Sequence, residues 1–351
     1  MSEEERIRQL SDLFGPSGFE DEIAAYVRRE LEPLKTVQDH MRNVRCELNP
    51  EASGPKVMLD AHLDEVGLIV QAIKPNGTMK FLMLGNMAAS SLPSSRFLIQ
   101  NSRGEKIPAV VAVKPPHFTS AAEKNAPLNV SDMVLDCGSR SAEETAETLG
   151  IRIGSPAVPD VVCRQEEKRG LFYGKAFDDR IGAAAQIEVL KRLAGRNLPC
   201  RVQGAFSVQE EVGERGVHAN YEALKPEVLI CFEGCPADDT FQEPYMVQAA
   251  LGRGPMLRHY DVSMITNWRF QKLALDTARE KVIPVQESVR SGGGTDGAAV
   301  NIEGVPAIVI GIPVRYIHSS NCWCAKADYE AAVDLAVAVI EKLDAETVAG
   351  L

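Results

Sequence analysis

The stretch KVMLDAHLDEVGLIVQAI, residues 56–73, marks a boundary between two kinds of structure in this chain. Its first half is an apolar β-strand that runs into imidazole and carboxylate side chains at His62 and Asp64. Its second half, GLIVQAI, opens a region of short strand-like segments broken by Pro, Gly and Asn-Gly turns. The stretch therefore predicts that one domain gives way to another near residue 66.

The region that follows, residues 67–165, reads as a small β-rich module. MKFLML, RFLIQN and AVVAV are further strand-like pieces of it, each too short for a helix. We expect this module to be a small β-barrel-like domain inserted into the rest of the chain.

The flanking parts, residues 1–66 and 166–351, show a different pattern. Two helical segments precede the quoted stretch, and from about residue 170 apolar strands alternate with amphipathic helices up to the final helical segment KADYEAAVDLAVAVIEKLDAE. Strands that alternate with helices favour a mostly parallel, mixed sheet with helices on both faces. The fold class predicted is α/β, with the β-rich domain inserted.

Composition narrows the function. The chain has 351 residues, 45% hydrophobic and 25% charged, as in a soluble globular protein. A formal net charge of −11 argues against nucleic acid as a partner, because phosphate binding needs clustered Lys and Arg. No apolar run is long enough to span a membrane, and the acidic start MSEEERIRQL does not resemble a signal peptide. We expect a cytoplasmic protein whose eight cysteines are reduced.

Ionisable residues recur where predicted strands end. Each has an ordinary structural explanation alone, such as a helix N-cap for Asp178 and Asp179. Together they are hard to explain without chemistry, because the carboxyl ends of parallel strands meet at one edge of the sheet. The residues at such positions are His62, Asp64, Asp178, Asp179, Glu210, Glu211, Glu233 and His318.

A set of histidines and carboxylates suits divalent ions such as zinc, cobalt or manganese. One His and two carboxylates for each ion, with one carboxylate shared, would hold two ions roughly 3.5 Å apart. A two-metal hydrolase also needs a proton acceptor that is not a ligand. The adjacent pair Glu210 and Glu211 in FSVQEEVGERG could divide these roles, since neighbouring residues of a strand point to opposite faces.

The sequence resembles the tetrahedral, dodecameric aminopeptidases, that is, the glutamyl aminopeptidase family of dinuclear metallopeptidases. The resemblance runs nearly end to end and implies a zinc-peptidase-like fold. The motifs that carry it, in family order, are LFGPSGFEDEI, DAHLDEVGLIV, VLDCGSRSAEE, GKAFDDRIG, SVQEEVGERG, LGRGP, GGGTDGAAV and GIPVRYIHSS.

The resemblance implies a role for each matched residue. His62 and Glu233 would bind one ion, Glu211 and His318 the other, and Asp178 both. Asp64 would hold the His62 ring, and Glu210 would be the general base. A cis peptide is expected between Asp178 and Asp179. The ions would be zinc, with cobalt or manganese as alternatives.

The predicted function is therefore a cytoplasmic metal-dependent aminopeptidase acting on peptides. The inserted domain, residues 67–165, would form dimers, and these could assemble into a dodecamer. The main alternative is an N-acyl amino acid deacylase or carboxypeptidase, because Glu233 stands where the family commonly has Asp and Glu occurs there in such enzymes. A glycoside hydrolase and a non-enzymatic subunit fit less well, since two histidines would have no role in the first and no ligand is missing for the second.

Two further residues are predicted with less support. SGGGTDG, residues 291–297, reads as a tight loop or as a backbone wall of the substrate pocket, with Asp296 near the substrate or the metals. Arg315 would steady ligands or bind substrate, and a surface ion pair explains it equally well.

Overall fold

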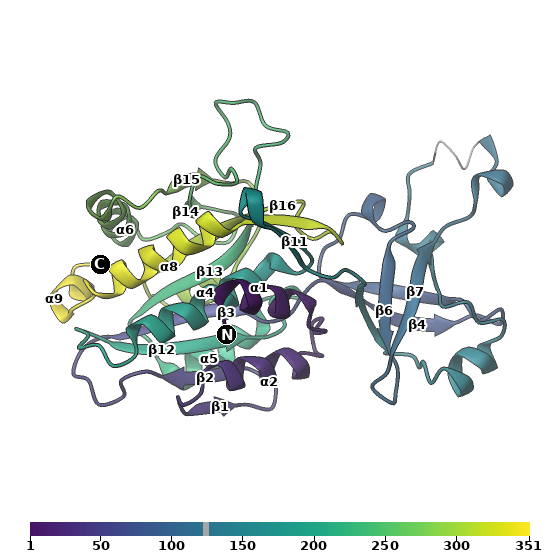
Figure 1. Ribbon diagram of the computed structural model, residues 1–351, viewed down its shortest axis with the longest axis horizontal. Coiled ribbons are helices and arrows are strands. Elements are labelled where there is room, and N and C mark those ends of the chain that lie inside the picture. The colour runs from purple at the N-terminus through teal and green to yellow at the C-terminus, as the bar shows by residue number, and fades with distance from the viewer. Residues whose placement is uncertain (122–125) are drawn as a thin grey trace.

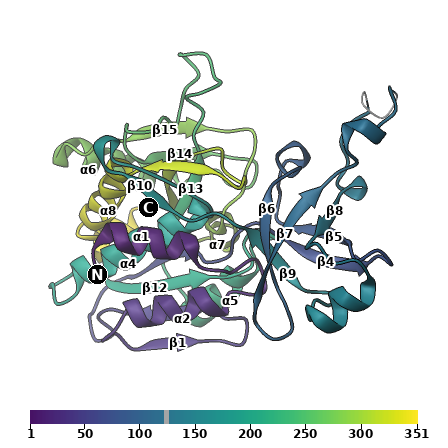
Figure 2. The same ribbon diagram turned by 45° about the vertical axis from the view of Figure 1, so that its right-hand side comes forward.

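The computed structural model describes residues 1–121 and 126–351. Figure 1 shows a large α/β domain joined to a smaller β-barrel that stands beyond one end of the large domain's strands. Figure 2 gives the same arrangement from a second direction. The fold class predicted from the sequence is confirmed: a large mixed sheet flanked by helices, and a separate closed barrel.

The large domain is built on an 11-stranded sheet, in the order β1-β2-β12-β3-β13-β16-β17-β11-β10, with β14 and β15 attached beside β16. Its strands are β1 Thr36–Gln38, β2 Val44–Glu47, β3 Lys56–His62, β10 Arg164–Glu166, β11 Leu171–Gly174, β12 Arg201–Ser207, β13 Val228–Pro236, β14 Met256–Tyr260, β15 Gln286–Val289, β16 Ala307–Arg315 and β17 Cys322–Ala325. The central four, β12, β3, β13 and β16, are mutually parallel, and antiparallel strands flank them.

Helices cover both faces of this sheet. They are α1 Glu3–Asp12, α2 Asp21–Glu30, α4 Phe177–Leu193, α5 Arg215–Leu224, α6 Trp268–Lys281, α7 Asp296–Asn301, α8 Lys326–Ile340 and α9 Ala345–Ala349. The helices α1, α2, α4, α6 and α8 share one hydrophobic core, and α5 and α7 share another. Because strand side chains alternate between faces, Val57 and Leu59 of β3 enter the first core and Met58 enters the second.

The barrel closes in the order β4-β5-β8-β7-β6-β9. Its strands are β4 Gly67–Ile73, β5 Met79–Leu84, β6 Arg96–Gln100, β7 Lys106–Ala112, β8 Val134–Asp136 and β9 Pro156–Pro159. It has a hydrophobic core of its own, which includes Leu68, Phe81 and Phe97. Four residues, 63–66, separate the end of β3 from the start of β4, so the barrel lies close to the carboxyl ends of the central strands (Figure 2).

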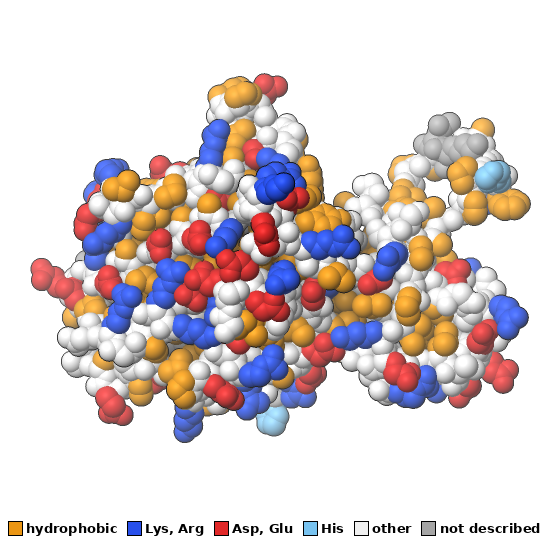
Figure 3. All heavy atoms as spheres, in the orientation of Figure 1, with side chains coloured by type: hydrophobic (Ala, Val, Ile, Leu, Met, Phe, Trp, Pro, Cys, Tyr) orange, Lys and Arg blue, Asp and Glu red, His pale blue; other side chains and the backbone are white. Residues whose placement is uncertain are grey.

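The surface carries no concentration of positive charge on the face seen in Figure 3, where acidic and basic side chains are interspersed. Within the described parts of the chain, no helix combines the length and apolarity that a membrane span requires.

Candidate metal centre

The predicted metal-binding residues come together at the carboxyl edge of the central strands. Five segments deliver them: His62 ends β3, Glu233 lies in β13, Glu211 lies in the turn after β12, His318 follows β16, and Asp178 lies at the start of α4. The predicted base Glu210 precedes Glu211 in the same turn. The Asp178–Asp179 peptide is cis, as the resemblance implied. Asp178 has non-helical backbone angles, and the regular part of α4 begins after Asp179.

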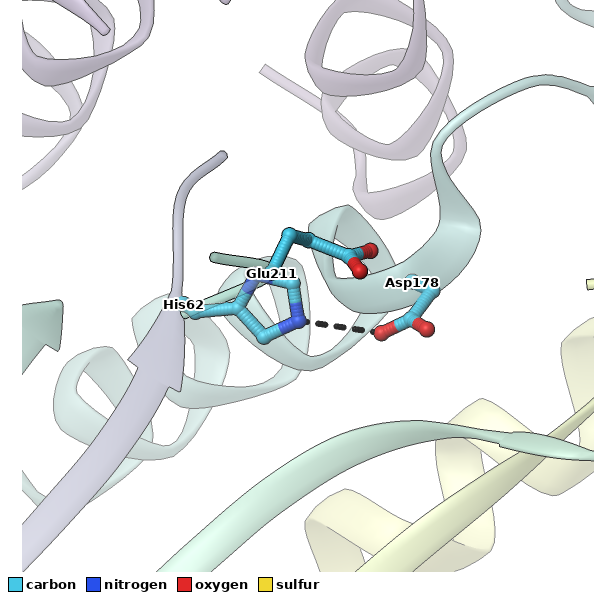
Figure 4. A group of neighbouring side chains, drawn as sticks. All are labelled: His62, Asp178 and Glu211. Atoms are coloured by element: carbon cyan, nitrogen blue, oxygen red, sulfur yellow. Dashed lines mark hydrogen bonds and ion pairs between the residues drawn. The ribbon is translucent and has the colours of Figure 1, made fainter. Parts of the chain in front are cut away.

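Asp178 lies between two histidines. His62 Nε2 is 3.0 Å from Asp178 Oδ1, and His318 Nε2 is 2.8 Å from Asp178 Oδ2. On the His62 side Glu233 Oε1 lies 3.5 Å from the ring nitrogen, and on the His318 side Glu211 Oε1 lies at 3.2 Å. Asp178 is therefore shared by two groups, each with one imidazole and one glutamate. Figure 4 shows His62, Asp178 and Glu211 converging, with ligating atoms that all lie within 4.8 Å of one another.

Both imidazole rings are held by their other nitrogen. His62 Nδ1 lies 3.1 Å from the backbone oxygen of Asp64, and His318 Nδ1 lies 2.8 Å from that of Asn86 in the barrel domain. A ring that donates its Nδ1 proton to a carbonyl keeps a free lone pair at Nε2 when it is neutral. Both lone pairs then face carboxylate oxygens, and this contact is repulsive unless a proton or a cation lies between them.

The donor atoms fit a cation at this position. Glu211 Oε1 is buried and receives no hydrogen bond of good geometry from any described residue. Imidazole nitrogen and carboxylate oxygen are the ligands of zinc and similar divalent ions, and second hydrogen bonds such as those of Nδ1 commonly orient such ligands. The residues that could hold metal are thus His62, Asp178, Glu211, Glu233 and His318.

Electrostatics in the site are dominated by burial and by the dense packing of charges. Burial and the neighbouring Asp178 charge raise the pKa of Glu233 well above its usual value. Burial alone would raise the pKa of Asp178 and lower that of His318, but their mutual hydrogen bond reverses both. The pKa of Asp178 is therefore lowered, and the pKa of His318 is raised to about 12. Both shifts favour positive charge beside the Asp178 carboxylate.

Glu210 and Glu211 do not lie in a strand. β12 ends at Ser207, and the two glutamates follow in a turn that starts with a left-handed residue, Gln209, at φ 58°. The strand-alternation argument for their divergence was therefore wrong, because a turn and not a pleat orients them. Both line the same cleft.

Asp64 fixes this turn. Its carboxylate accepts the backbone N–H of Glu210 at 3.0 Å and that of Glu211 at 3.2 Å, and the Ser17 hydroxyl at 2.6 Å. The same carboxylate lies 3.5 Å from His62 Nδ1. Asp64 is completely buried, so one side chain sets the positions of a histidine and both glutamates.

The centre opens into a cleft of about 460 Å³. Asp178, Glu210, Glu211, Glu233 and His318 line it, together with Asn86, Gly213, Glu214, Gly234, Pro236, Arg258, Gly293, Gly294 and Ile317. Asn86 belongs to the barrel domain, so the inserted domain contributes to the cleft wall as well as holding His318.

Gly293 and Gly294 of the SGGGTDG loop line the cleft, whereas the side chains of the two predicted substrate residues lie outside its lining. Asp296 is buried at the start of α7, beneath the cleft lining, and burial together with the charge of Asp60 raises its pKa well above the usual value. Arg315 makes a two-pronged ion pair with Asp239, at 2.9 and 2.6 Å. Neither side chain lines the cleft.

Sequence reasoning missed three residues that shape the cleft: Asn86, Glu214 and Arg258. Asn86 gave no signal, because it acts through its backbone oxygen from another domain. Arg258 did give one, since an arginine in the otherwise apolar start of MLRHY is unusual for a buried strand.

Gly234 sets the distance between β13 and the start of α4. A Cβ atom at this position would lie 2.6 Å from the backbone oxygen of Phe177 and 2.7 Å from the Asp178 Cα. We expect Gly234→Ala to displace Asp178 and to weaken zinc affinity by about 10- to 100-fold, the range seen when the support of a ligand is disturbed. Competition with a chromophoric chelator measures this. Gly292→Ala is the control, because an added Cβ there meets nothing within 4 Å; equal affinities in the two variants would contradict the account.

Comparison with known proteins finds relatives along nearly the whole chain. The family model described as M42 glutamyl aminopeptidase matches residues 42–335. The glutamyl aminopeptidase of Lactococcus lactis is 30% identical over 98% of both chains, and the lysyl aminopeptidase of Pyrococcus furiosus is 30% identical over 97% of both.

Two solved structures share the whole fold. A TET aminopeptidase from a marine sediment archaeon, Thaumarchaeota archaeon SCGC AB-539-E09, superposes with a TM-score of 0.94 at 35% identity over 99% of both chains. The TET1 peptidase of Pyrococcus horikoshii, described as assembling into a tetrahedron or a large octahedral shell, has a TM-score of 0.88 at 26% identity, over 97% of this chain and 100% of that one.

Proposed function

Because the chain belongs to the M42 glutamyl aminopeptidase family and is a peptide hydrolase, we propose that it removes N-terminal residues from peptides at a two-metal centre, with Glu210 as general base. The observation that carries this proposal is the sharing of Asp178 between two groups of one His and one Glu, with both Nε2 atoms facing it.

We assign His62 and Glu233 to one ion, His318 and Glu211 to the other, and Asp178 to both. The ions would be zinc, with cobalt or manganese as alternatives. When bound, two divalent ions polarise a peptide carbonyl and lower the pKa of a water. Asp178, Glu211 and Glu233 bring three negative charges against the four positive charges of such a pair, so the ligand set nearly neutralises it.

Glu210 is suited to move the proton. Glu210 lines the cleft, and its Oε2 lies 3.8 Å from His62 Nε2, farther than Glu233 Oε1 at 3.5 Å. Burial raises the pKa of Glu210 well above the usual value, so the side chain is a stronger base than an exposed glutamate. In the proposed reaction Glu210 takes a proton from the attacking water and gives it to the nitrogen of the leaving amine.

Asp64 would act as a positioning residue. It holds the backbone of Glu210 and the ring of His62 from one buried carboxylate, so the base and a ligand keep a fixed separation. The roles first expected for Asp296 and Arg315 in binding substrate stay predictions.

The test of the reaction class is whether cleavage needs a free α-amine. A tripeptide and its N-acetylated form are incubated with the metal-loaded protein, and products are identified by mass spectrometry. We expect the free peptide to lose its first residue and the acetylated one to stay intact. Release of acetate, or of the last residue, would instead identify a deacylase or a carboxypeptidase.

We also propose that the protein acts as a homo-oligomer, with the barrel domain forming dimers. Support for oligomerisation comes from exposed aromatic side chains on two projections. Phe241 and Tyr245, 71% and 85% exposed, lie in the large domain between β13 and β14, and Phe118, 74% exposed, lies in the inserted domain and is the one that bears on a barrel dimer. Figure 3 shows hydrophobic side chains on both projections. Exposed clusters of this kind commonly mark interfaces. Sedimentation velocity would test the proposed homo-oligomer, and a monomer at micromolar protein concentration would contradict it. A cytoplasmic location remains a prediction.

A further inference from the structure

A buried arginine lines the cleft beside the metal centre. Arg258 lies in β14, its side chain is 3% exposed, and Pro236, Glu233 and Gly293 line the cleft with it. Arginine is almost never buried without a partner, because removal of its charge from water is costly. The contacts of Arg258 therefore need a full account.

Among residues 1–121 and 126–351, Asp261 is the hydrogen-bond partner found for the guanidinium of Arg258. Nη1 donates to Asp261 Oδ2 at 2.8 Å. Nε is buried and has no hydrogen-bond partner among the described residues. Asp261 is itself fixed, since its other oxygen accepts hydrogen bonds from the Ser263 backbone and hydroxyl and from the Met264 backbone. The ion pair with Asp261 holds the Arg258 guanidinium in one orientation and leaves part of its N–H groups without a protein acceptor among the described residues.

The Arg258 side chain lines a space large enough for part of a substrate. Arg258, Pro236 and Gly293 also line a second cavity of about 330 Å³, which continues the cleft away from the metal centre. Arg290 lines this second cavity but is paired with Asp238 at 3.3 Å. Arg258 thus lies where the cleft and its extension meet.

Charges near Arg258 leave room for an anion. Glu233 would be neutralised by metal, and Asp261 is satisfied by four hydrogen bonds. Apart from the proposed metal ligands and the proposed base Glu210, the acid that lines the cleft is Glu214. Burial and the charge of Asp261 raise the pKa of Glu214, which weakens its repulsion of an incoming carboxylate.

We propose that Arg258 binds a carboxylate of the substrate and so determines specificity. A guanidinium fork matches a carboxylate with two parallel hydrogen bonds. This inference rests on the proposed function and extends it to the substrate. Two sources have this chemistry: the acidic side chain of the first residue, or the free α-carboxylate at the end of a dipeptide.

The experiment compares wild-type and Arg258→Met proteins on four unblocked substrates: glutamyl p-nitroanilide, leucyl p-nitroanilide, Leu-Gly and Leu-Gly amide. We expect Arg258→Met to lower kcat/KM by about 10- to 100-fold on one of the carboxylate-bearing substrates, chiefly by raising KM. A loss of this size corresponds to the loss of one hydrogen bond to a charged group. Leucyl p-nitroanilide should change less than about threefold. Loss on glutamyl p-nitroanilide identifies the side chain, and loss on Leu-Gly but not its amide identifies the terminal carboxylate.

Two further variants keep the test decisive. Arg258→Met with Asp261→Asn removes both charges of the pair, and should show the same selective loss if the single variant folds poorly. Arg6→Met is the matched control, because Arg6 is equally buried and paired with Glu30 and Glu188 far from the cleft; it should leave the ratios between substrates unchanged.

An equal loss on all four substrates in both Arg258 variants would overturn the inference, since it would mean that Arg258 only neutralises Asp261 and Glu233. A wild-type protein inactive on all four would overturn the proposed function and this inference with it.

Discussion

Replacement of Glu210 by Gln should lower kcat by about 10²- to 10⁴-fold while two equivalents of zinc remain bound, because general-base catalysis contributes about that much. Gln has nearly the same shape as Glu but cannot accept the proton. The backbone of residue 210 would still be held by Asp64, so the turn should keep its place. Initial rates and the metal content of the dialysed protein measure the two effects separately.

Glu211→Gln is the matched variant, one residue away in the same turn. Its side chain lies 3.2 Å from His318 Nε2 beside Asp178, so its loss should reduce zinc affinity as well as activity. The two neighbouring substitutions should therefore have different effects: Glu210→Gln keeps the metal and loses turnover, whereas Glu211→Gln loses the metal. A fully active Glu210→Gln protein would contradict the assigned base.

Removal of Glu65 should have the largest effect on stability. Glu65 is 1% exposed, and both of its oxygens lie 2.6 Å from the Nζ of Lys175, with Arg180 Nη2 at 3.5 Å. Arg180 is completely buried and donates to backbone oxygens of Leu10, Leu63 and Gly15. Glu65→Ala would leave two buried cations without their carboxylate, and we expect it to cost about 3–5 kcal/mol in the free energy of unfolding.

Urea denaturation at a fixed protein concentration measures this loss. Glu22→Ala is the control: Glu22 pairs with Lys106 at 2.8 Å, but both side chains are about one-third exposed. Exposed ion pairs contribute about 1 kcal/mol or less. Similar losses in the two variants would mean that the buried cluster does not stabilise the fold as its geometry indicates.

The sequence was informative about the site because its residues follow strand ends. His62 and His318 are separated by more than 250 positions, yet each follows or ends an apolar strand, and parallel strands deliver their carboxyl ends to one edge. The same logic separated the barrel from the large sheet, since the short segments after Gly67 could not extend the pattern of alternating strands and helices.

Other features of the site depend on contacts that no local pattern encodes. The orientation of Glu210 and Glu211 comes from a turn held by Asp64, and was wrongly attributed to strand pleating. The backbone of Asn86 reaches His318 from another domain. Arg315 could not be distinguished from a surface ion pair in the sequence, and it does pair with Asp239. Each of these contacts joins residues that are distant in the sequence, so a local sequence pattern cannot predict it.

The most direct test of the two-metal account is a zinc titration of metal-free protein, with release of the N-terminal residue from an unblocked peptide measured at each step. The account predicts no turnover without metal and full turnover only when two equivalents per chain are bound, because Asp178 is shared by two complete ligand groups. Full activity in the metal-free protein, or at one equivalent with no further rise, would contradict it.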